Sequence, residues 1–423
     1  MSSLYEGDVF MSEKLAEVFE QYEVDILGTR KGRGAVILST DKGMMILEPF
    51  RGNMVRLEQE YVLKQILEKN GFFCMDMIVP NREGILFSCD RYRQPFVMKR
   101  HFDGNECDMH CPADMVRSIK LLANFHSYGK LAAAEFDPAW KKYRKEKEEK
   151  RISEIRQAVE NGGELEWISR VYDIRENILI EMLENTGSSE VQQDEKEENE
   201  VAFENDKEIA DTFVRHNREL KKIYRYIGKV KKKNAFEDLF LQVYGEYAKQ
   251  GEYCVEQLAG KGRETLKMVG EKHFGICHGS FNQHNILLFE KGRTVEVDGA
   301  GENVLDKDGA IVHFERFSKG NQLNDLYQFA RKAMEKNHFN IELLRELLYA
   351  YSEEIPLSKE DYHYIYILFS YPEKFWKIAN GYYNSNKAFL SPKYVEKLQN
   401  VILQEEEKQE MLEKFGTLQV SLD

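Results

Sequence analysis

The stretch of the chain best suited to chemistry is CHGSFNQHNILL, residues 277–288. It places Asn285 seven residues after His278, and it runs into an apolar segment typical of a strand. This is the spacing of loops that transfer a phosphoryl group to a hydroxyl, in which an Asp accepts the proton and an Asn binds Mg²⁺. The position that needs the carboxylate holds Ser280. The loop therefore predicts either a phosphotransferase or a protein that has kept only the fold of one.

The bulk composition limits the class of protein. A length of 423 residues allows two or three packed lobes, and 42% hydrophobic residues indicate an ordered chain. The formal net charge of −13 argues against a general nucleic-acid binder, which needs a basic surplus. Residues 1–25 are acidic and do not resemble a signal peptide, and no stretch approaches the roughly 18 apolar residues of a membrane span. We therefore expect a cytoplasmic protein that binds no nucleic acid and has no membrane span.

Residues 1–104 are expected to form a small α+β lobe. Residues 25–50 alternate like two or three antiparallel strands with a glycine-bearing bend. Residues 53–72 carry apolar side chains near a 3.6 period and end at Gly71, which predicts a helix. Further strands are predicted at 84–90 and 95–102.

Residues 105–423 are expected to form a larger, mainly helical lobe that carries the 277–288 loop. Within it, the tract at about 140–207 is strongly charged and is predicted to be a partly disordered insertion, with its most acidic part at 185–206. The segment at 219–233 is rich in Lys and Arg. This segment is either a binding face for an anion or a partner, or the solvated side of an amphipathic helix.

The loop and several other stretches resemble the kinase-like superfamily of aminoglycoside phosphotransferases and choline kinases. Within that superfamily, the chain is most similar to the spore coat protein S family. The similar stretches are HFDGNECD at 101–108, LLANFH at 121–126, the segment at 219–241 and NDLYQFARKAMEKNHF at 324–339. The resemblance implies a bilobal, protein-kinase-like α+β fold: a small antiparallel β lobe with one helix, followed by a mainly helical lobe.

The resemblance also assigns roles in the larger lobe. The proton acceptor of the superfamily falls on Ser280, and its first metal ligand falls on Asn285. The second metal ligand falls on His313 in IVHFERF, because the superfamily has an Asp-Leu pair about a dozen residues later and Asp325 begins such a pair. A rival for this position is Asp298 in VEVDGAG.

Vestigial nucleotide-binding positions are implied in and near the small lobe. The strand Lys that orients the ATP phosphates falls on Glu48, and the helix Glu that pairs with it falls on Glu60 or, one slip away, on Glu58. Two carboxylates facing each other there would repel phosphates. The remaining implied nucleotide-binding positions are Gly32, Gly34, Lys99 and Arg100.

Phosphoryl transfer needs five positions, which the resemblance assigns to Glu48, Glu60, Ser280, Asn285 and His313. Three of them, Glu48, Ser280 and His313, have side chains that are unsuitable for this chemistry. Ser280 is not a base at neutral pH, and loss of a general base alone costs roughly 10²–10⁴ in rate. Glu48 replaces a cation, and the His313 imidazole is a poor ligand for Mg²⁺, which prefers oxygen. His278 and Asp325 match positions that brace the loop from behind, so we expect them to be structural.

These substitutions favour a catalytically inactive kinase-like protein, a pseudokinase, that acts as a structural or interaction module. The resemblance places such a module in spore coat assembly, with other proteins as its partners and with no cofactor. Two alternatives stay open. One is a divergent small-molecule phosphotransferase that uses ATP and Mg²⁺, with Asp298 or Glu315 as a metal ligand. The other is a nucleotide-binding switch without turnover.

Overall fold

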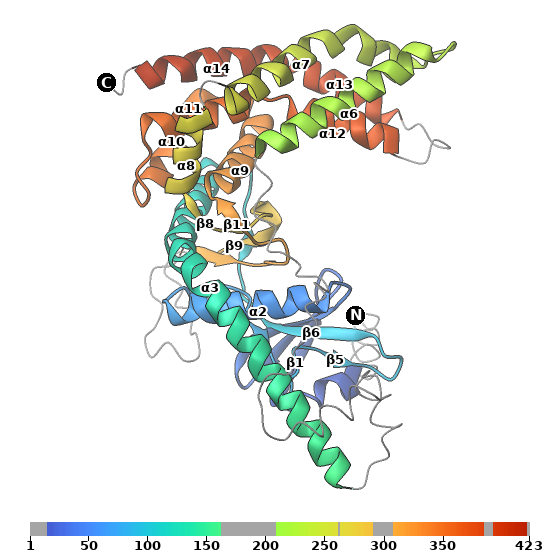
Figure 1. Cartoon of the computed structure of the whole chain (residues 1–423), viewed down its shortest axis with the longest axis vertical. Coiled ribbons are helices and arrows are strands. Elements are labelled where there is room, and N and C mark those ends of the chain that lie inside the picture. The colour runs from blue at the N-terminus through green and yellow to red at the C-terminus, as the bar shows by residue number, and fades with distance from the viewer. Residues whose placement is uncertain (1–14, 162–208, 261–262, 291–307, 385–391, 421–423) are drawn as a thin grey trace, which may run out of the picture. The chain divides into compact units, whose positions relative to one another are not determined.

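The structure is a computed structural model, and it describes residues 15–161, 209–260, 263–290, 308–384 and 392–420 (Figure 1). The chain divides into two compact units. One holds residues up to Ala132 and from Glu204 onward, and the other holds Ala133–Phe203. The acidic tract at 185–206 and Asp298 lie outside the described residues.

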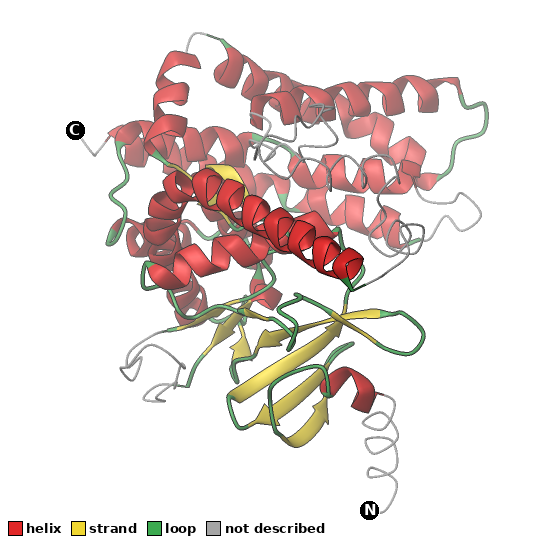
Figure 2. Cartoon of the chain, turned by 60° about the horizontal axis from the view of Figure 1, so that its bottom comes forward, coloured by secondary structure: helices red, strands yellow, loops and turns green. Residues whose placement is uncertain are grey.

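A six-stranded antiparallel sheet forms the N-terminal part of the first unit (Figure 2). Its strands are β1 (Ile26–Lys31), β2 (Val36–Thr40), β3 (Gly43–Pro49), β4 (Ile78–Val79), β5 (Ser88–Cys89) and β6 (Pro95–Arg100). The order is β1-β2-β3-β6-β4, and β5 pairs with β6. β3 and β6 are paired so that Glu48 lies opposite Val97 and Ile46 opposite Lys99. Side chains alternate across a strand, so Glu48 and Lys99 emerge on the same face.

One helix, α2 (Met54–Lys69), follows β3. Asn53 caps its first turn by accepting a hydrogen bond from the backbone N–H of Arg56, and Gly71 follows its end with a φ of 105°. The helix buries Leu57, Leu63 and Leu67, which anchors it to the rest of the fold. This packing fixes which side chains of α2 turn inward.

Short strands connect the N-terminal sheet to the helical part. β7 (Asn105–Glu106) and β10 (Gly309–Ile311) flank β9 (Ile286–Leu288) in one sheet, and β8 (Phe274–Cys277) pairs with β11 (Ser318–Asn321) in another. The 277–288 loop thus lies between β8 and β9. Its chain turns through a 3-10 helix at Gln283–Asn285.

The remaining elements are helices. They are α3 (Pro112–Glu160), α6 (Ile209–Lys229), α7 (Ala235–Ala259), α8 (Arg263–Lys272), α9 (Leu323–Lys336), α10 (Ile341–Ser352), α11 (Lys359–Ser370), α12 (Glu373–Asn384), α13 (Lys393–Leu403) and α14 (Glu405–Val420). α6, α7, α12 and α13 share a hydrophobic core that includes Ile223, Phe240, Phe375 and Leu398. Among the described helices, none has the length and apolar character needed to cross a membrane.

The expected fold class is confirmed: an N-terminal antiparallel sheet precedes a mainly helical part. The single helix expected with the sheet is α2, and residues 15–19 add a short helical segment before β1. The strand predicted at 84–90 is wrong in extent, since only Ser88–Cys89 pairs there. In the 219–233 segment, Lys221, Lys222 and Arg225 are exposed while Ile223 and Ile227 are buried, as in an amphipathic helix with a solvated basic side.

Candidate functional site

The loop between β8 and β9 is fastened by one carboxylate at the start of α9. Asp325 is buried, and its two oxygens accept hydrogen bonds from consecutive backbone N–H groups, of His278 at 2.6 Å and of Gly279 at 3.0 Å. Hydrogen bonds to an ionised carboxylate are about twice as strong as neutral ones. Asp325 also lies in the first turn of α9, where the helix dipole favours a negative charge.

His278 is a buried, neutral imidazole in this arrangement. Its Nδ1 accepts a hydrogen bond from the backbone N–H of Ser280 at 3.2 Å, so Nε2 carries the proton and donates it to the carbonyl of Val312 at 3.1 Å. Burial lowers the pKa of His278, which keeps the ring uncharged. His278 therefore links the loop to the segment that follows β10.

A second buried histidine, His126 on α3, supports Asp325 from the other side. Its Nε2 lies 3.4 Å from Asp325 Oδ2, and its Nδ1 lies 2.8 Å from the hydroxyl of Tyr351. His126 is not among the site residues predicted from the sequence. The signal available was a His at the end of the apolar run LLANFH, in one of the stretches that carried the resemblance.

Ser280 and Asn285 face each other across the loop. The Asn285 amide donates to the backbone carbonyl of Ser280 at 2.9 Å and lies 3.4 Å from Ser280 Oγ. Asn282 makes the same pair of contacts, at 2.7 and 3.4 Å. The side-chain amides of Asn282 and Asn285 thus hold the loop at Ser280. Both of the NH₂ groups that contact Ser280 Oγ are hydrogen-bond donors.

His313 follows β10, beside the loop. The backbone N–H of Val312 donates to the carbonyl of Asn285 at 3.0 Å, which places residues 312 and 313 next to the 3-10 turn. The His313 side chain contacts Glu315 at 3.4 Å. That contact, with the negative charges of Asp76, Glu315 and Glu48, raises the pKa of His313 against the opposing effect of burial. A protonated imidazole has no lone pair to offer a metal.

A dense ionic cluster lies where α2, β3 and β6 meet the 313–315 segment. At its centre is the buried Lys99, whose Nζ is 3.0 Å from Glu315, 3.5 Å from Asp76, 3.6 Å from Glu60 and 3.8 Å from Glu48. These carboxylates raise the pKa of Lys99 although burial alone would lower it. Glu60, rather than Glu58, is therefore the α2 carboxylate that reaches this cluster.

A second cation, Lys64, completes the cluster. Its ammonium group is fully buried and donates to Glu60 at 2.6 Å, to the Asp76 carboxylate at 2.7 Å and to the Asp76 carbonyl at 2.7 Å. The expectation that Glu48 and Glu60 simply face each other is wrong, because Lys99 lies within 4 Å of both. Lys64 and Asp76 are not among the residues predicted from the sequence. Glu60 and Lys64 are spaced i, i+4 on the helix face of Leu57 and Leu67, and this spacing was the available signal.

The cluster remains acidic in total. Glu48, Glu60, Asp76 and Glu315 face two ammonium groups and the His313 imidazole, so among these described side chains the carboxylates outnumber the ammonium groups by two. Burial alone would raise the pKa of Asp76, but the charges of Lys64 and Lys99 lower it. The pKa of Glu315 is likewise lowered, since the hydrogen bond from His313 and the charge of Lys99 outweigh burial.

The other predicted nucleotide positions lie outside this cluster. Gly32 and Gly34 form the turn between β1 and β2, with the Gly32 N–H donating to the Ala35 carbonyl at 2.8 Å. Arg100 pairs with Glu68 at 3.2 Å. Within the described part of the chain, no three His, Cys, Asp or Glu side chains are arranged to hold a metal ion.

Gly279 has a backbone conformation and surroundings that exclude a side chain. Its φ is 71°, and a Cβ there would lie well inside van der Waals contact of the Arg316 carbonyl. Gly279→Ala is expected to lower the free energy of unfolding by about 2 kcal/mol, measured by chemical denaturation. Gly34→Ala is the matched control, because Gly34 has a φ of 77° with nothing within 4 Å, so Ala costs only the conformational penalty of about 1 kcal/mol. Equal losses in the two variants would contradict the close packing of the loop on Arg316.

Comparison with solved structures shows the class of fold. The chain aligns with the crystal structure of an aminoglycoside phosphotransferase from Alicyclobacillus acidocaldarius with a TM-score of 0.67, 12% identity and 96% coverage of each chain. A spectinomycin phosphotransferase in complex with ADP and spectinomycin aligns at a TM-score of 0.46, with 11% identity over 93% of this chain and 98% of that chain. The alignment with the Alicyclobacillus acidocaldarius protein shows that the chain has a kinase-like fold.

The comparison of sequences gives a more specific match than the comparison of folds. Spore coat protein S of Bacillus subtilis is 25% identical over 187 residues, which is 43% of this chain and 49% of that protein. The match thus spans about half the length of this curated relative. No protein-family model matches the chain. The resemblance predicted from the motifs is confirmed: the chain is a relative of spore coat protein S with a kinase-like fold.

Proposed function

We propose that this chain does not transfer phosphoryl groups and instead acts as an interaction or structural module. The observation that carries the proposal is Ser280, to which the resemblance assigns the proton-acceptor position, in a loop held by Asp325 and by the Asn285 amide. A hydroxyl takes up no proton at neutral pH, and the groups that contact Ser280 Oγ are the amides of Asn282 and Asn285, which are donors. The loop therefore has the shape for catalysis without the base.

The ionic cluster supports the same proposal. Phosphoryl transfer requires cations that neutralise the phosphates. Here Lys99 is engaged by four carboxylates, and Lys64 is fully buried among two of them. An ATP phosphate entering beside Glu48 and Glu315 would meet net negative charge. The resemblance assigns the second metal position to His313, whose pKa is raised by its hydrogen bond to Glu315 and by the nearby carboxylates, which makes the ring a poorer ligand for a cation.

The partners of such a module would be other proteins, and the relative named above suggests the spore coat. This step rests on the sequence similarity to spore coat protein S over 187 residues. A fluorescent fusion produced in a sporulating host should concentrate at the surface of the forming spore. Diffuse fluorescence throughout the mother cell would reject the assignment to the coat.

One observation favours a second candidate, a divergent ATP-dependent phosphotransferase. Lys99 on β6 lies 3.6 Å from Glu60 on α2, so a neighbouring strand supplies a Lys–Glu pair although β3 has lost its lysine. Such a pair orients the α- and β-phosphates of ATP in kinases. Lys99 is buried and engaged by three further carboxylates, which makes this candidate the weaker one.

The deciding experiment measures ADP formation from ATP and Mg²⁺ with a panel of aminoglycosides, choline and other small hydroxyl acceptors. We expect the wild-type chain and Asn285→Ala to give the same background rate. Acceptor-dependent ADP formation by the wild type that Asn285→Ala abolishes would reject the proposal and favour the second candidate.

A further inference from the structure

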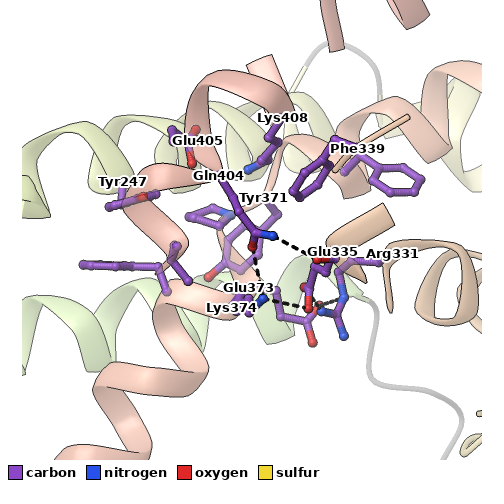
Figure 3. Close-up of a pocket in the computed structure, with 14 residues that line it drawn as sticks. Tyr247, Arg331, Glu335, Phe339, Tyr371, Glu373, Lys374, Gln404, Glu405 and Lys408 are labelled. Atoms are coloured by element: carbon purple, nitrogen blue, oxygen red, sulfur yellow. Dashed lines mark hydrogen bonds and ion pairs between the residues drawn. The ribbon is translucent and has the colours of Figure 1, made fainter. Parts of the chain in front are cut away.

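A small cavity lies among the helices of the C-terminal part, away from the loop at 277–288. It is lined from α7, α9, α11, α12, α13 and α14 and from the connections beside them, and its volume is about 40 Å³ (Figure 3). No residue of the 277–288 loop lines it. A buried water needs roughly 10–15 Å³ on this scale, so the cavity has room for a group of a few heavy atoms.

The unusual feature of the cavity is Lys408 on α14. The residue is only 8% exposed, and its Nζ contacts two neutral acceptors, Gln250 Oε1 and the Ser370 carbonyl, each at 3.3 Å. Within the described residues, no carboxylate lies within 4.0 Å of this ammonium group. A buried charge without a counter-ion is strongly unfavourable. Burial accordingly lowers the pKa of Lys408.

The other cations that line the cavity already have partners. Arg331 pairs with Glu335, and Lys374 lies 3.3 Å from Glu335. Figure 3 draws these contacts as dashed lines, whereas none reaches Lys408. Of the three cations that line the cavity, Lys408 is the one without a carboxylate within 4.0 Å among the described residues, so an anion that bound to it would displace no ion pair seen there.

A second buried donor borders the same cavity. The Arg331 Nε–H makes no hydrogen bond, and the Glu373 carboxylate lies 3.8 Å from this nitrogen. Arg331 is 7% exposed. Two side chains that are more than nine-tenths buried thus offer unused donor capacity to one cavity.

The charge and the walls of the cavity limit the ligand. Glu335, Glu373 and Glu405 also line it, so a doubly charged anion such as phosphate would be repelled more strongly than a singly charged one. Phe339 and Phe369 provide apolar walls. We propose that the cavity binds a small monocarboxylate, with its carboxylate paired to Lys408 and its short carbon chain against the aromatic rings.

The test titrates the full chain with sodium acetate and sodium butyrate, with sodium chloride at equal ionic strength as the salt control, and follows the heat of binding and the thermal midpoint. We expect saturable carboxylate binding that raises the midpoint beyond the effect of chloride. Lys408→Met should weaken this binding at least tenfold. Lys414→Met is the matched control, because Lys414 is on the same helix, is exposed, and lies 3.8 Å from Glu410; it should leave binding unchanged.

Three results would overturn the proposal. The first is an equal response of the wild type to carboxylate and chloride, which needs no variant. The second is unchanged carboxylate binding in Lys408→Met, or in Lys408→Gln if the Met variant does not fold. The third is phosphate binding tighter than acetate that is lost in the Lys408 variant, since it would assign the cavity to a different anion.

Discussion

Replacing Lys64 by Met is expected to lower the free energy of unfolding by about 3–5 kcal/mol, because removing one partner of a buried ion pair leaves the other charged and unsolvated. The Lys64 ammonium group makes hydrogen bonds of 2.6 Å to Glu60 and 2.7 Å to Asp76. Without it, both carboxylates depend on Lys99, which lies 3.5 Å from Asp76 and 3.6 Å from Glu60. Chemical denaturation at pH 7 measures the loss.

The effect of Lys64→Met should depend on pH in a defined direction. The folded-state pKa of Asp76 is lowered despite burial, chiefly by Lys64 and Lys99. A lowered pKa gives stability that is fully present above the unfolded-state pKa, which is about 3.9 for Asp, and that is lost as the pH falls below it. The variant has less of this stabilisation to lose, so its difference from the wild type should stay constant from pH 7 to about pH 4 and narrow as the pH falls further below the unfolded-state pKa of Asp.

Lys42→Met provides the matched control for this prediction. Lys42 is exposed in the turn between β2 and β3, and its loss should change the free energy of unfolding by no more than about 0.5 kcal/mol. A Lys64 variant as stable as the Lys42 variant, or a difference that widens in acid, would contradict the ionic cluster.

Asp325→Asn is expected to lower the free energy of unfolding by about 3 kcal/mol, since one charge-assisted hydrogen bond is lost and one buried N–H is left without an acceptor. The two oxygens of Asp325 accept from the N–H groups of His278 and Gly279. An amide has only one oxygen, and its NH₂ group would face a second donor. The loop should therefore also loosen, with faster hydrogen exchange at residues 278–280.

The matched control is Asp211→Asn. Asp211 lies in the first turn of α6 and is exposed, so it shares with Asp325 only the favourable interaction with a helix N-terminus. That interaction contributes about 0.3–1 kcal/mol. If Asp325→Asn costs no more than Asp211→Asn, or leaves exchange in the loop unchanged, Asp325 does not hold the loop.

Local sequence patterns were sufficient to predict much of the fold. Alternation and turn residues predicted β1 to β3, and the apolar period ending at Gly71 predicted α2. The strand at 84–90 was overpredicted because its alternating side chains pair with β6 only at Ser88 and Cys89. Pairing depends on the partner strand, which a local pattern does not contain.

The ionic cluster could be predicted only in part. The resemblance placed Glu48, Glu60 and Lys99 in one nucleotide site, but it predicted neither the ion pairs of Lys99 with these carboxylates nor Lys64, which lies one helical turn after Glu60. Lys99 reaches the cluster because β6 pairs with β3, and Asp76 because the chain after α2 contacts His313. Such contacts follow from tertiary packing, so sequence spacing alone predicted repulsion where the fold has a buried, partly neutralised network.

We propose that the ionic cluster offers no site for the phosphates of a nucleotide, because four carboxylates lie within 4 Å of the Lys99 ammonium group. Calorimetric titration of the wild-type chain with ATP, with and without Mg²⁺, tests this claim most directly. We predict no saturable heat in either titration at millimolar nucleotide. Saturable, Mg²⁺-dependent binding that Asn285→Ala removes would contradict the claim.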